Sequence, residues 1–423
     1  MSEPRTQLVV VGLGYVGLPL AVEATRAGLH VTGLDQNDRV VSGLMSGASH
    51  VGDVTDLDIR SIRERGFTAT SDARVIAEAD VVVVCVPTPL SADGGPDLTA
   101  LKSAASAISE HVKRRCLVVL ESTTYPGTTD DIFVPILERS GLVAGEDYHV
   151  AFSPERVDPG NPEYGIKNTP KVVGGYTPGC TAVAVAFYSR FVDTVVTAKG
   201  TREAEMAKLL ENTYRHINIA LVNEMARFSF EMGIDLWNVI DCAATKPFGF
   251  QTFRPGPGVG GHCIPIDPNY LSHAVRTQLG RPFRFVELAE EINASMPGYV
   301  ARRIQDLLND NCRAVRGSKI LLLGVTYKPN IADQRESPAV PLAKQLRDMG
   351  ASVSYHDPYV QTWGPEAGER LERVADLDLA LASADISVLL QHHRDYDPDR
   401  LTKNARLLFD TRGVTRSSQV ARL

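Results

Sequence analysis

The chain has 423 residues, of which 43% are hydrophobic and 22% charged, and its formal net charge at pH 7 is −7. This balance is typical of a folded globular protein with two or three domains, and it excludes a disordered or fibrous chain. The negative charge and the absence of a long Lys/Arg run argue against a nucleic-acid partner, although a few local cations could still hold an anionic small molecule.

Apolar runs and cysteines narrow the class of protein further. The longest apolar runs, residues 81–86 and 320–325, are too short to cross a bilayer and fit buried strands. Because the N-terminus has no basic segment followed by a long apolar stretch, we expect a cytoplasmic protein without a membrane partner. The six cysteines show neither CxxC nor His/Cys ligand spacing, so we expect free thiols and no metal site.

The first half of the chain alternates strand and helix patterns. Residues 18–27 have helical spacing and are followed by Gly28, a residue that favours the end of a helix. Short apolar β-type runs occur at residues 7–12, 30–35, 80–86 and 116–121. This alternation predicts a doubly wound parallel sheet.

The middle of the chain has a different pattern. Residues 202–232 contain no proline or glycine, and apolar residues recur among them at helical spacing. This pattern predicts a long central helix that ends near Gly233. Residues 255–268 are too rich in proline and glycine for a helix or an interior strand. We expect that loop to lie at a functional site.

A second strand-rich region follows, with β-type runs at residues 319–324, 352–355, 385–390 and 406–410. The expected fold class is therefore α/β, with two Rossmann-like doubly wound parallel-sheet domains joined by a central helical domain. The expected boundaries are residues 1–200, 201–305 and 306–423.

A G-x-G-x-x-G pattern lies between the first strand and the first helix. Gly12, Gly14 and Gly17 permit a tight turn whose backbone N–H groups could approach a pyrophosphate. Asp35 ends the next strand, where a carboxylate accepts hydrogen bonds from an adenosine ribose and repels a 2′-phosphate. These features favour NAD over NADP. The alternative is that the glycines serve only helix-strand packing and that Asp35 is a solvated strand end.

Further cofactor contacts are expected near this turn. Leu13, Tyr15 and Val16 lie between the glycines of the pattern. Arg39, one turn into the next helix, could stack near the adenine, and it fits an ordinary surface arginine equally well.

Seven segments in order carry a family resemblance: residues 12–17, Val86-Pro87-Thr88-Pro89, Glu121-Ser122-Thr123, Ser153-Pro154-Glu155, Lys208 with Asn212, residues 260–267 (GGHCIPID) and residues 324–337. Through them the chain resembles the nucleotide-sugar 6-dehydrogenases over nearly its whole length. The resemblance implies NAD as the cofactor, a nucleotide sugar as the substrate, and cofactor contacts from Thr88, Thr123 and Arg335.

The chemistry of this family requires a nucleophile. Oxidising an alcohol to an acid removes two hydrides, and each NAD accepts one. A thiolate that captures the intermediate aldehyde as a thiohemiacetal leads to a thioester that water cleaves. The resemblance assigns this role to Cys263, which Gly260 and Gly261 precede. A cysteine without such neighbours is more often a buried structural thiol.

The resemblance also assigns roles to groups around Cys263. Lys208 and Asn212, four residues apart on the expected helix, resemble the pair that stabilises an oxyanion. Asp267 resembles the residue that positions the hydrolytic water together with Thr123. The alternatives are a solvated helix surface for Lys208 and a turn-forming role for Asp267.

The sugar pocket departs from part of the family. Glu155 resembles the carboxylate near the reacting sugar, and Arg156 is a further substrate candidate. The UDP-glucose enzymes usually have a second Glu four residues later, where this chain has Pro159. This difference and His262 favour the branch that acts on acetamido sugars, the UDP-N-acetylglucosamine and UDP-N-acetylmannosamine dehydrogenases.

The diphosphate of the substrate needs cations. Lys328 follows a predicted strand end, where open α/β sheets bind ligands, and resembles a substrate contact. Arg412 and Gly260 also resemble substrate contacts, Arg254 could reach a substrate of the same or a neighbouring subunit, and Arg335 resembles a residue on the cofactor side. For each arginine a surface ion pair is the alternative.

The resemblance further implies a homodimer, or a multiple of one, built on the long helix. Two other functions stay open: a single-step dehydrogenase of the 6-phosphogluconate or hydroxyacyl type, and a protein that binds a nucleotide sugar without catalysis. The sugar (glucose, N-acetylglucosamine, N-acetylmannosamine or mannose) and the nucleotide (UDP, dTDP or GDP) are not determined by the sequence.

Overall fold

The computed structural model describes residues 6–91, 94–158, 160–161, 163–261, 264–365, 368 and 370–423. The chain divides into two compact units. The first consists of Met1–Glu211 with Asn269–Arg281, and the second of Asn212–Pro268 with Pro282–Leu423. Among the described helices, none has the length and hydropathy that a bilayer span requires.

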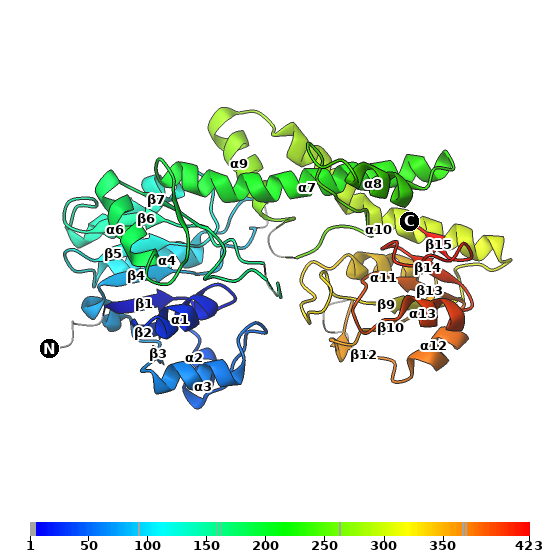
Figure 1. Ribbon diagram of the computed structural model, residues 1–423, viewed down its shortest axis with the longest axis horizontal. Coiled ribbons are helices and arrows are strands. Elements are labelled where there is room, and N and C mark those ends of the chain that lie inside the picture. Colours follow the sequence, from blue (N-terminus) through cyan, green and yellow to red (C-terminus); the bar gives the residue numbers. More distant parts are fainter. Residues whose placement is uncertain are drawn as a thin grey trace. The chain divides into compact units, whose positions relative to one another are not determined.

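The first unit is built on an eight-stranded sheet with the order β3-β2-β1-β4-β5-β6-β7-β8 (Figure 1). Its strands are β1 (Gln7–Val11), β2 (His30–Leu34), β3 (Thr68–Thr70), β4 (Val81–Val84), β5 (Leu117–Leu120), β6 (His149–Phe152), β7 (Lys171–Gly175) and β8 (Val195–Thr197). Strands β1 to β6 are parallel, which confirms the doubly wound arrangement. Strand β7 pairs antiparallel with β6, so the sheet is mixed at this edge.

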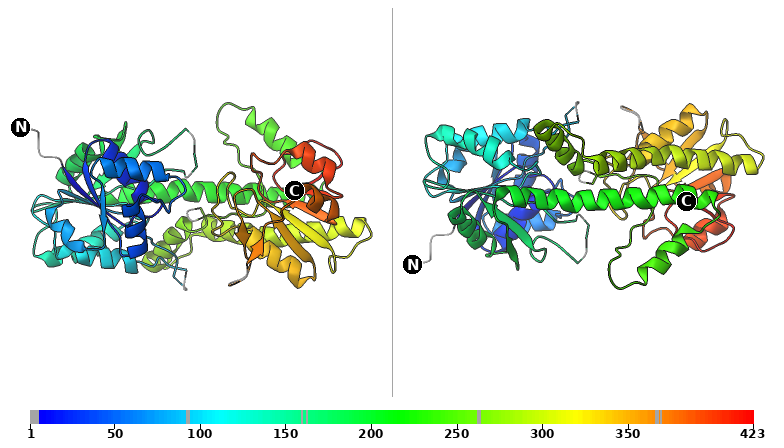
Figure 2. Two further views of the ribbon diagram at one scale, coloured as in Figure 1. Left: turned by 90° about the horizontal axis from the view of Figure 1, so that it is seen from below. Right: turned by 90° about the horizontal axis from the view of Figure 1, so that it is seen from above.

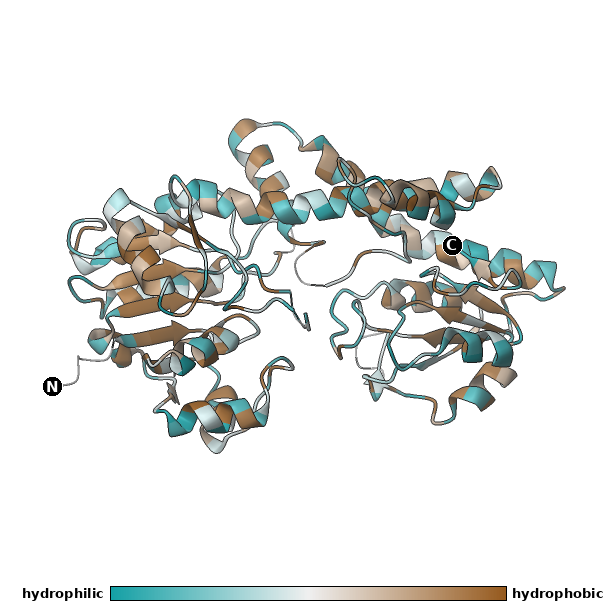
Figure 3. Cartoon of the chain, viewed as in Figure 1, coloured by the Kyte–Doolittle hydropathy of each residue, from teal (hydrophilic) through white to brown (hydrophobic). Residues whose placement is uncertain are grey.

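Helices cover both faces of this sheet. They are α1 (Gly17–Arg26), α2 (Asp38–Ser46), α3 (Asp56–Glu64), α4 (Thr99–Ser109), α5 (Val134–Leu137) and α6 (Pro178–Tyr188). All four residues of β4 are buried and alternate between the two hydrophobic clusters on the faces of the sheet. A strand buried on both faces has no polar face, which explains its unbroken run of valines (Figure 3).

Helix α7 (Thr201–Glu231) confirms the long helix predicted from residue 202 onward. In the second unit, its later turns pack against α10 (Arg284–Asp310), as the views in Figure 2 show. The Asn223 side chain donates a hydrogen bond to Asn293 across this contact, at 2.9 Å. Helices α8 (Leu236–Ala244) and α9 (Asp267–Leu279) flank the loop that the sequence predicts between residues 255 and 268.

A five-stranded parallel sheet with the order β10-β9-β13-β14-β15 forms the core of the second unit. Its strands are β9 (Lys319–Leu323), β10 (Ser352–His356), β13 (Ile386–Leu389), β14 (Leu408–Asp410) and β15 (Ala421–Arg422), with helices α11 (Ala339–Asp348), α12 (Leu377–Ser383) and α13 (Pro398–Asn404) and a small pair, β11 (Thr362–Trp363) and β12 (Leu371–Glu372). The second Rossmann-like sheet is thereby confirmed.

Gly14 and Gly17, the second and third glycines of the G-x-G-x-x-G pattern, have different surroundings. Substituting them should therefore have different effects on stability. A Cβ at Gly17 would lie 1.9 Å from the Gly12 carbonyl oxygen, whereas a Cβ at Gly14 would meet no atom within 4 Å. Gly17→Ala should therefore lower the free energy of unfolding by roughly 1–3 kcal/mol, and Gly14→Ala by less than about 0.5 kcal/mol. Thermal melting without added ligand measures both, and equal melting temperatures would contradict this account of the turn.

Candidate active site

The Gly-rich turn is held against the end of β2. The Gly12 N–H donates to the Leu34 carbonyl at 2.8 Å, and the Leu13 N–H donates to the Asp35 carboxylate at 2.9 Å. Asp35 is therefore fixed beside the turn. The His50 imidazole, which the sequence reading missed, contacts the Leu13 carbonyl at 2.9 Å.

The side chains around the turn differ in exposure. Leu13 is fully buried, Val16 is partly buried, and Tyr15 is 48% exposed. Arg39 is exposed in the first turn of α2. Since Gly14 is exposed and has open space around it, the residues of this turn fit the close approach of a pyrophosphate.

Thr123 lies on a segment that leaves the carboxyl end of β5. The Lys208 ammonium donates to its hydroxyl at 2.6 Å, and Lys208 itself is only 8% exposed. The Thr88 hydroxyl donates to the Thr123 carbonyl at 2.8 Å, and the Ser122 hydroxyl donates to the Val86 carbonyl at 2.7 Å. The structure thus brings together three residues that the sequence places far apart.

Glu205, one turn before Lys208 on α7, was not predicted from the sequence. Its carboxylate accepts hydrogen bonds from the Gly127 N–H at 2.6 Å and from the Thr129 N–H and hydroxyl at 2.9 and 2.7 Å. Burial raises the pKa of Glu205 to about 7, although these hydrogen bonds oppose the shift.

A buried charge cluster lies behind the strand ends. The Lys171 ammonium is 2.9 Å from the Glu121 carboxylate and 3.6 Å from the Glu155 carboxylate, and the Tyr188 hydroxyl donates to Glu121. Burial alone would lower the pKa of Lys171, but the two carboxylates raise it. Burial raises the pKa of Glu121 despite the Lys171 ammonium. Lys171 and Tyr188 were missed because neither belongs to a local motif.

Glu155 and its neighbour Arg156 have separate partners. The second oxygen of Glu155 accepts a hydrogen bond from the Val157 N–H at 2.6 Å, which fixes the carboxylate in orientation. The Arg156 guanidinium forms an ion pair with Glu211 at 2.7 Å and donates to the Pro170 carbonyl at 2.7 Å.

In the second unit, the Asn212 side-chain amide donates to the Asp267 carboxylate at 2.6 Å. Both residues are buried, and Asp267 is the first residue of α9. The four-residue spacing of Lys208 and Asn212 places them on one face of α7. His262 and Cys263 lie outside the described residues.

The loop before Cys263 packs tightly. The Gly261 N–H donates to the Arg335 carbonyl at 3.1 Å. A Cβ at Gly260 would lie 2.5 Å from the Glu336 carbonyl, and one at Gly261, where φ is +93°, would lie 2.7 Å from the Tyr327 ring. Only glycine fits at these two positions.

Two of the predicted arginines form exposed ion pairs. Arg254 pairs with Asp241 at 2.6 Å, and Arg335 pairs with Asp333 at 2.6 Å. The structure therefore realises the ion-pair alternative for both side chains.

Arg412 differs from them, because among the described residues it has no ion-pair partner. Its guanidinium donates to the Leu390 carbonyl at 2.5 Å and to the Gln391 side-chain oxygen at 2.8 Å. The Asp410 carboxylate accepts from backbone N–H groups of the following turn and from the Thr415 hydroxyl. Burial lowers the pKa of Arg412 to about 10, with Asp410 opposing the shift. A partly buried cation with neutral acceptors is suited to an anionic ligand.

The segment that carries Lys328 is held in place by a buried pair of residues, His393 and Asp357. The Thr326 hydroxyl donates to the Lys328 carbonyl at 2.9 Å, and the Asn330 N–H donates to Nδ1 of His393 at 2.9 Å. Nε2 of His393 lies 3.0 Å from the Asp357 carboxylate, and both residues are fully buried. Because Nδ1 accepts a hydrogen bond, Nε2 carries the proton. Sequence reasoning missed this dyad.

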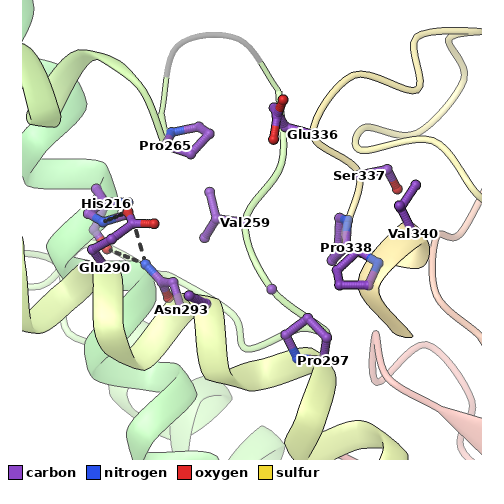
Figure 4. Close-up of a pocket in the computed structure, with 13 residues that line it drawn as sticks. His216, Val259, Pro265, Glu290, Asn293, Pro297, Glu336, Ser337, Pro338 and Val340 are labelled. Atoms are coloured by element: carbon purple, nitrogen blue, oxygen red, sulfur yellow. Dashed lines mark hydrogen bonds and ion pairs between the residues drawn. The ribbon is translucent and has the colours of Figure 1, made fainter. Parts of the chain in front are cut away.

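A cavity of about 440 Å³ adjoins the loop in the second unit. Figure 4 shows His216, Glu290 and Asn293 on one side of it and Ser337, Pro338 and Val340 on the other. Nε2 of His216 lies 3.4 Å from the Glu290 carboxylate.

Several known proteins are similar to this chain in sequence. A UDP-N-acetyl-D-glucosamine 6-dehydrogenase of Pseudomonas aeruginosa is 37% identical over 84% of this chain and 83% of that protein. A UDP-N-acetyl-D-mannosamine dehydrogenase of Salmonella typhimurium is 35% identical over 97% of this chain and 99% of that protein. The protein CapL of Staphylococcus aureus is 34% identical over 98% and 97%.

Solved structures agree with these similarities. The UDP-D-ManNAc dehydrogenase of Pyrococcus horikoshii superposes with a TM-score of 0.88 at 31% identity, covering 99% of this chain and 98% of that one. A UDP-glucose dehydrogenase of Pyrobaculum islandicum gives a TM-score of 0.86 at 25% identity, with 100% and 98% covered.

Three family models match in chain order: the NAD binding domain of the UDP-glucose/GDP-mannose dehydrogenase family at residues 6–192, its central domain at 202–295 and its UDP binding domain at 321–417. The family resemblance of the sequence is thereby confirmed. The chain belongs to the UDP-glucose/GDP-mannose dehydrogenase family, and it is an NAD-dependent oxidoreductase that acts on a nucleotide sugar.

Proposed function

We propose that the chain oxidises the C6 alcohol of a nucleotide-activated hexose to the uronic acid in two steps, with Cys263 as the covalent nucleophile. One observation supports this best: Lys208 and Asn212 lie one turn apart on α7, both buried, and each is hydrogen-bonded to another candidate catalytic residue. NAD, when bound, supplies the hydride acceptor, and two molecules are reduced per sugar.

In the first half of the reaction, the C6 hydroxyl loses its proton and a hydride to give the aldehyde. The Lys208 ammonium and the Asn212 amide would stabilise the negative charge that develops on the sugar oxygen, because buried donors act strongly in a low dielectric. The Cys263 thiolate then adds to the aldehyde carbon, and the resulting thiohemiacetal loses a second hydride to become a thioester.

In the second half, water cleaves the thioester and releases the acid and the Cys263 thiol. Asp267, in hydrogen-bond contact with Asn212, is proposed to orient the water and accept its proton. Thr123 is proposed to position the same water, and Glu155, held by the Val157 N–H, to shape the sugar side of the pocket.

We propose that Arg412, Lys328 and Gly260 bind the nucleotide-sugar side of the substrate. Arg412 supplies a cation without a carboxylate partner among the described residues, and Gly260 lies in the loop before Cys263, packed against the Glu336 carbonyl. Arg254, Arg335 and Arg156 would have to leave their ion pairs to contribute, which makes them weaker candidates.

For the sugar, we propose an acetamido hexose. The relatives with 35–37% identity named above carry the names of N-acetylglucosamine and N-acetylmannosamine enzymes. The presence of Pro159 in place of a second Glu four residues after Glu155 supports the same choice. For the domain organisation, we propose the division into residues 1–200, 201–305 and 306–423.

We further propose a homodimer built on α7. Tyr214, Leu221 and Phe228 recur every seven residues on this helix, and their side chains are 45%, 53% and 45% exposed. Large apolar side chains at heptad spacing form a stripe that a second helix covers, and a second copy of the chain supplies one.

The two-step chemistry predicts a product ratio. Each nucleotide sugar should yield two NADH, and Cys263→Ala should reduce acid formation by about three orders of magnitude, since no thioester forms. The exposed Cys242 provides the control, because Cys242→Ala should leave the rate unchanged. NADH absorbance with product analysis gives both quantities. One NADH per sugar, with an unaffected Cys263→Ala variant, would instead identify a single-step dehydrogenase.

Arg412→Gln should raise the KM for the nucleotide sugar about 10- to 100-fold, because a charge-assisted hydrogen bond is lost, while kcat changes little. Arg400→Gln is the matched control, since Arg400 forms an exposed ion pair with Asp378. Steady-state kinetics and a melting curve for each variant are the measurements. An unchanged KM in a folded Arg412→Gln protein would remove Arg412 from the substrate site.

Leu221→Glu should convert the dimer into a monomer, because a carboxylate would be buried without a partner in the interface. Leu57→Glu, at a 72% exposed leucine of α3, is the control and should leave the dimer intact. Sedimentation equilibrium distinguishes the two masses. A Leu221→Glu protein with the mass of the parent would contradict the role of the stripe.

A further inference from the structure

Glu205 fastens the segment that carries Thr123. Its carboxylate is 1% exposed, and all three of its described hydrogen bonds come from Gly127 and Thr129, on the same segment. Gly127 has φ of +98°, a conformation that turns its N–H and that of Thr129 toward one carboxylate. The segment between β5 and α5 is therefore attached to α7 at a defined point.

The same segment is attached to α7 at two other points. Lys208 donates to the Thr123 hydroxyl one turn after Glu205. One turn before Glu205, the Thr201 hydroxyl donates to Asp130 at 2.6 Å and Arg202 pairs with Asp130 at 3.0 Å. Of these attachments, the one at Glu205 is the most deeply buried.

Lys208 and Thr123 depend on Glu205 to different degrees. Lys208 is placed by the backbone of a 31-residue helix, which keeps its geometry without Glu205. Thr123 lies on irregular chain, where the position of the hydroxyl depends on the hydrogen bonds that hold the chain at both sides. Thr88 and Ser122 hold the side toward β5, and Glu205 holds the other side.

The use of a carboxylate here is costly for stability. A buried carboxylate pays a desolvation penalty, which is the reason the pKa of Glu205 rises to about 7. An ionised carboxylate nevertheless accepts three converging donors, which neither a glutamine amide nor an apolar side chain does. Costly buried polar groups of this kind are often retained where a functional group must be positioned.

We propose that Glu205 is a positioning residue for thioester hydrolysis: by holding the segment of Gly127 and Thr129 on α7, it keeps the Thr123 hydroxyl where the hydrolytic water is bound. This inference rests on the two-step function proposed above. It assigns Glu205 to the second half of the reaction, because the hydride transfers depend on Lys208 and Asn212, which α7 places by itself.

The test is the pre-steady-state kinetics of Glu205→Gln. The amide replaces one acceptor oxygen with a donor, which then faces either the Gly127 N–H or the Thr129 N–H. Both hydrides leave before hydrolysis, so the variant should show a burst of two NADH per active site at the parent rate. Turnover should then be about 10- to 100-fold slower, and the thioester on Cys263 should accumulate and be detected by acid quench and mass spectrometry.

Two further variants complete the test. Glu203→Gln, at an exposed position in the same turn of α7, should behave as the parent in both phases. Thr129→Val removes only the hydroxyl donor to Glu205 and should give the same selective slowing, about 3- to 10-fold, in a protein that folds even if Glu205→Gln does not.

The outcomes separate this inference from the proposed function. Equal slowing of the burst and of turnover in Thr129→Val and Glu205→Gln, or no slowing in either, would overturn the role of Glu205. If the parent protein itself forms no thioester and gives one NADH per sugar, the proposed two-step function is wrong, whatever the variants do.

Discussion

A buried ammonium in contact with a hydroxyl is the interaction on which the proposed chemistry depends. Lys208 is 8% exposed and donates to Thr123 at 2.6 Å. An ammonium removed from water needs hydrogen-bond acceptors. The segment after β5 that carries Thr123 therefore has to be held close to the helix that carries Lys208. Thr88 and Ser122 hold the Thr123 segment to the chain that follows β4, and Glu205 holds it to α7.

The cations Lys171 and Arg412, one in each unit, have different kinds of partner. In the first, Lys171 lies between the carboxylates of Glu121 and Glu155, so the buried cation has anionic partners within the protein. In the second, Arg412 donates to the neutral oxygens of Leu390 and Gln391 within the part of the chain that the structure describes, and the nearby Asp410 is engaged by the following turn. A compensated cluster orients Glu155, whereas an uncompensated cation gains most when an anionic ligand binds. The diphosphate of a nucleotide sugar, the ligand proposed for Arg412, carries such a negative charge.

Features with a local or periodic pattern could be predicted from the sequence. The valine run of β4, the glycines of the first turn and the uninterrupted pattern of α7 each reflect interactions within a few residues, and the structure confirms the elements they predict. The pairing of Arg335 with Asp333 could also have been foreseen, since an Asp two residues before an Arg is within reach of its guanidinium.

Other features depend on contacts between distant residues. Lys171 stands alone at the start of β7, and its carboxylate partners are 16 and 50 residues away in the sequence (171 − 155 and 171 − 121). A glutamate such as Glu205 is a common residue at exposed helix positions. Only the fold shows that it is buried against Gly127. The antiparallel direction of β7 could likewise not be predicted from its residues, because a buried strand is apolar whichever way it runs.

Helix geometry explains why α7 is suited to carry groups for both halves of the proposed reaction. Residues four apart are separated by about 6 Å along the axis and lie on one face, so Lys208 and Asn212 share a face of the helix. Glu205, one turn earlier, is directed at the segment of Thr123, and Asn212, one turn later, at Asp267. One helix thus carries the proposed donor pair and Glu205. Without Glu205 the backbone of α7 would keep Lys208 and Asn212 at their places in the helix, whereas the segment of Thr123 would lose one of its attachments.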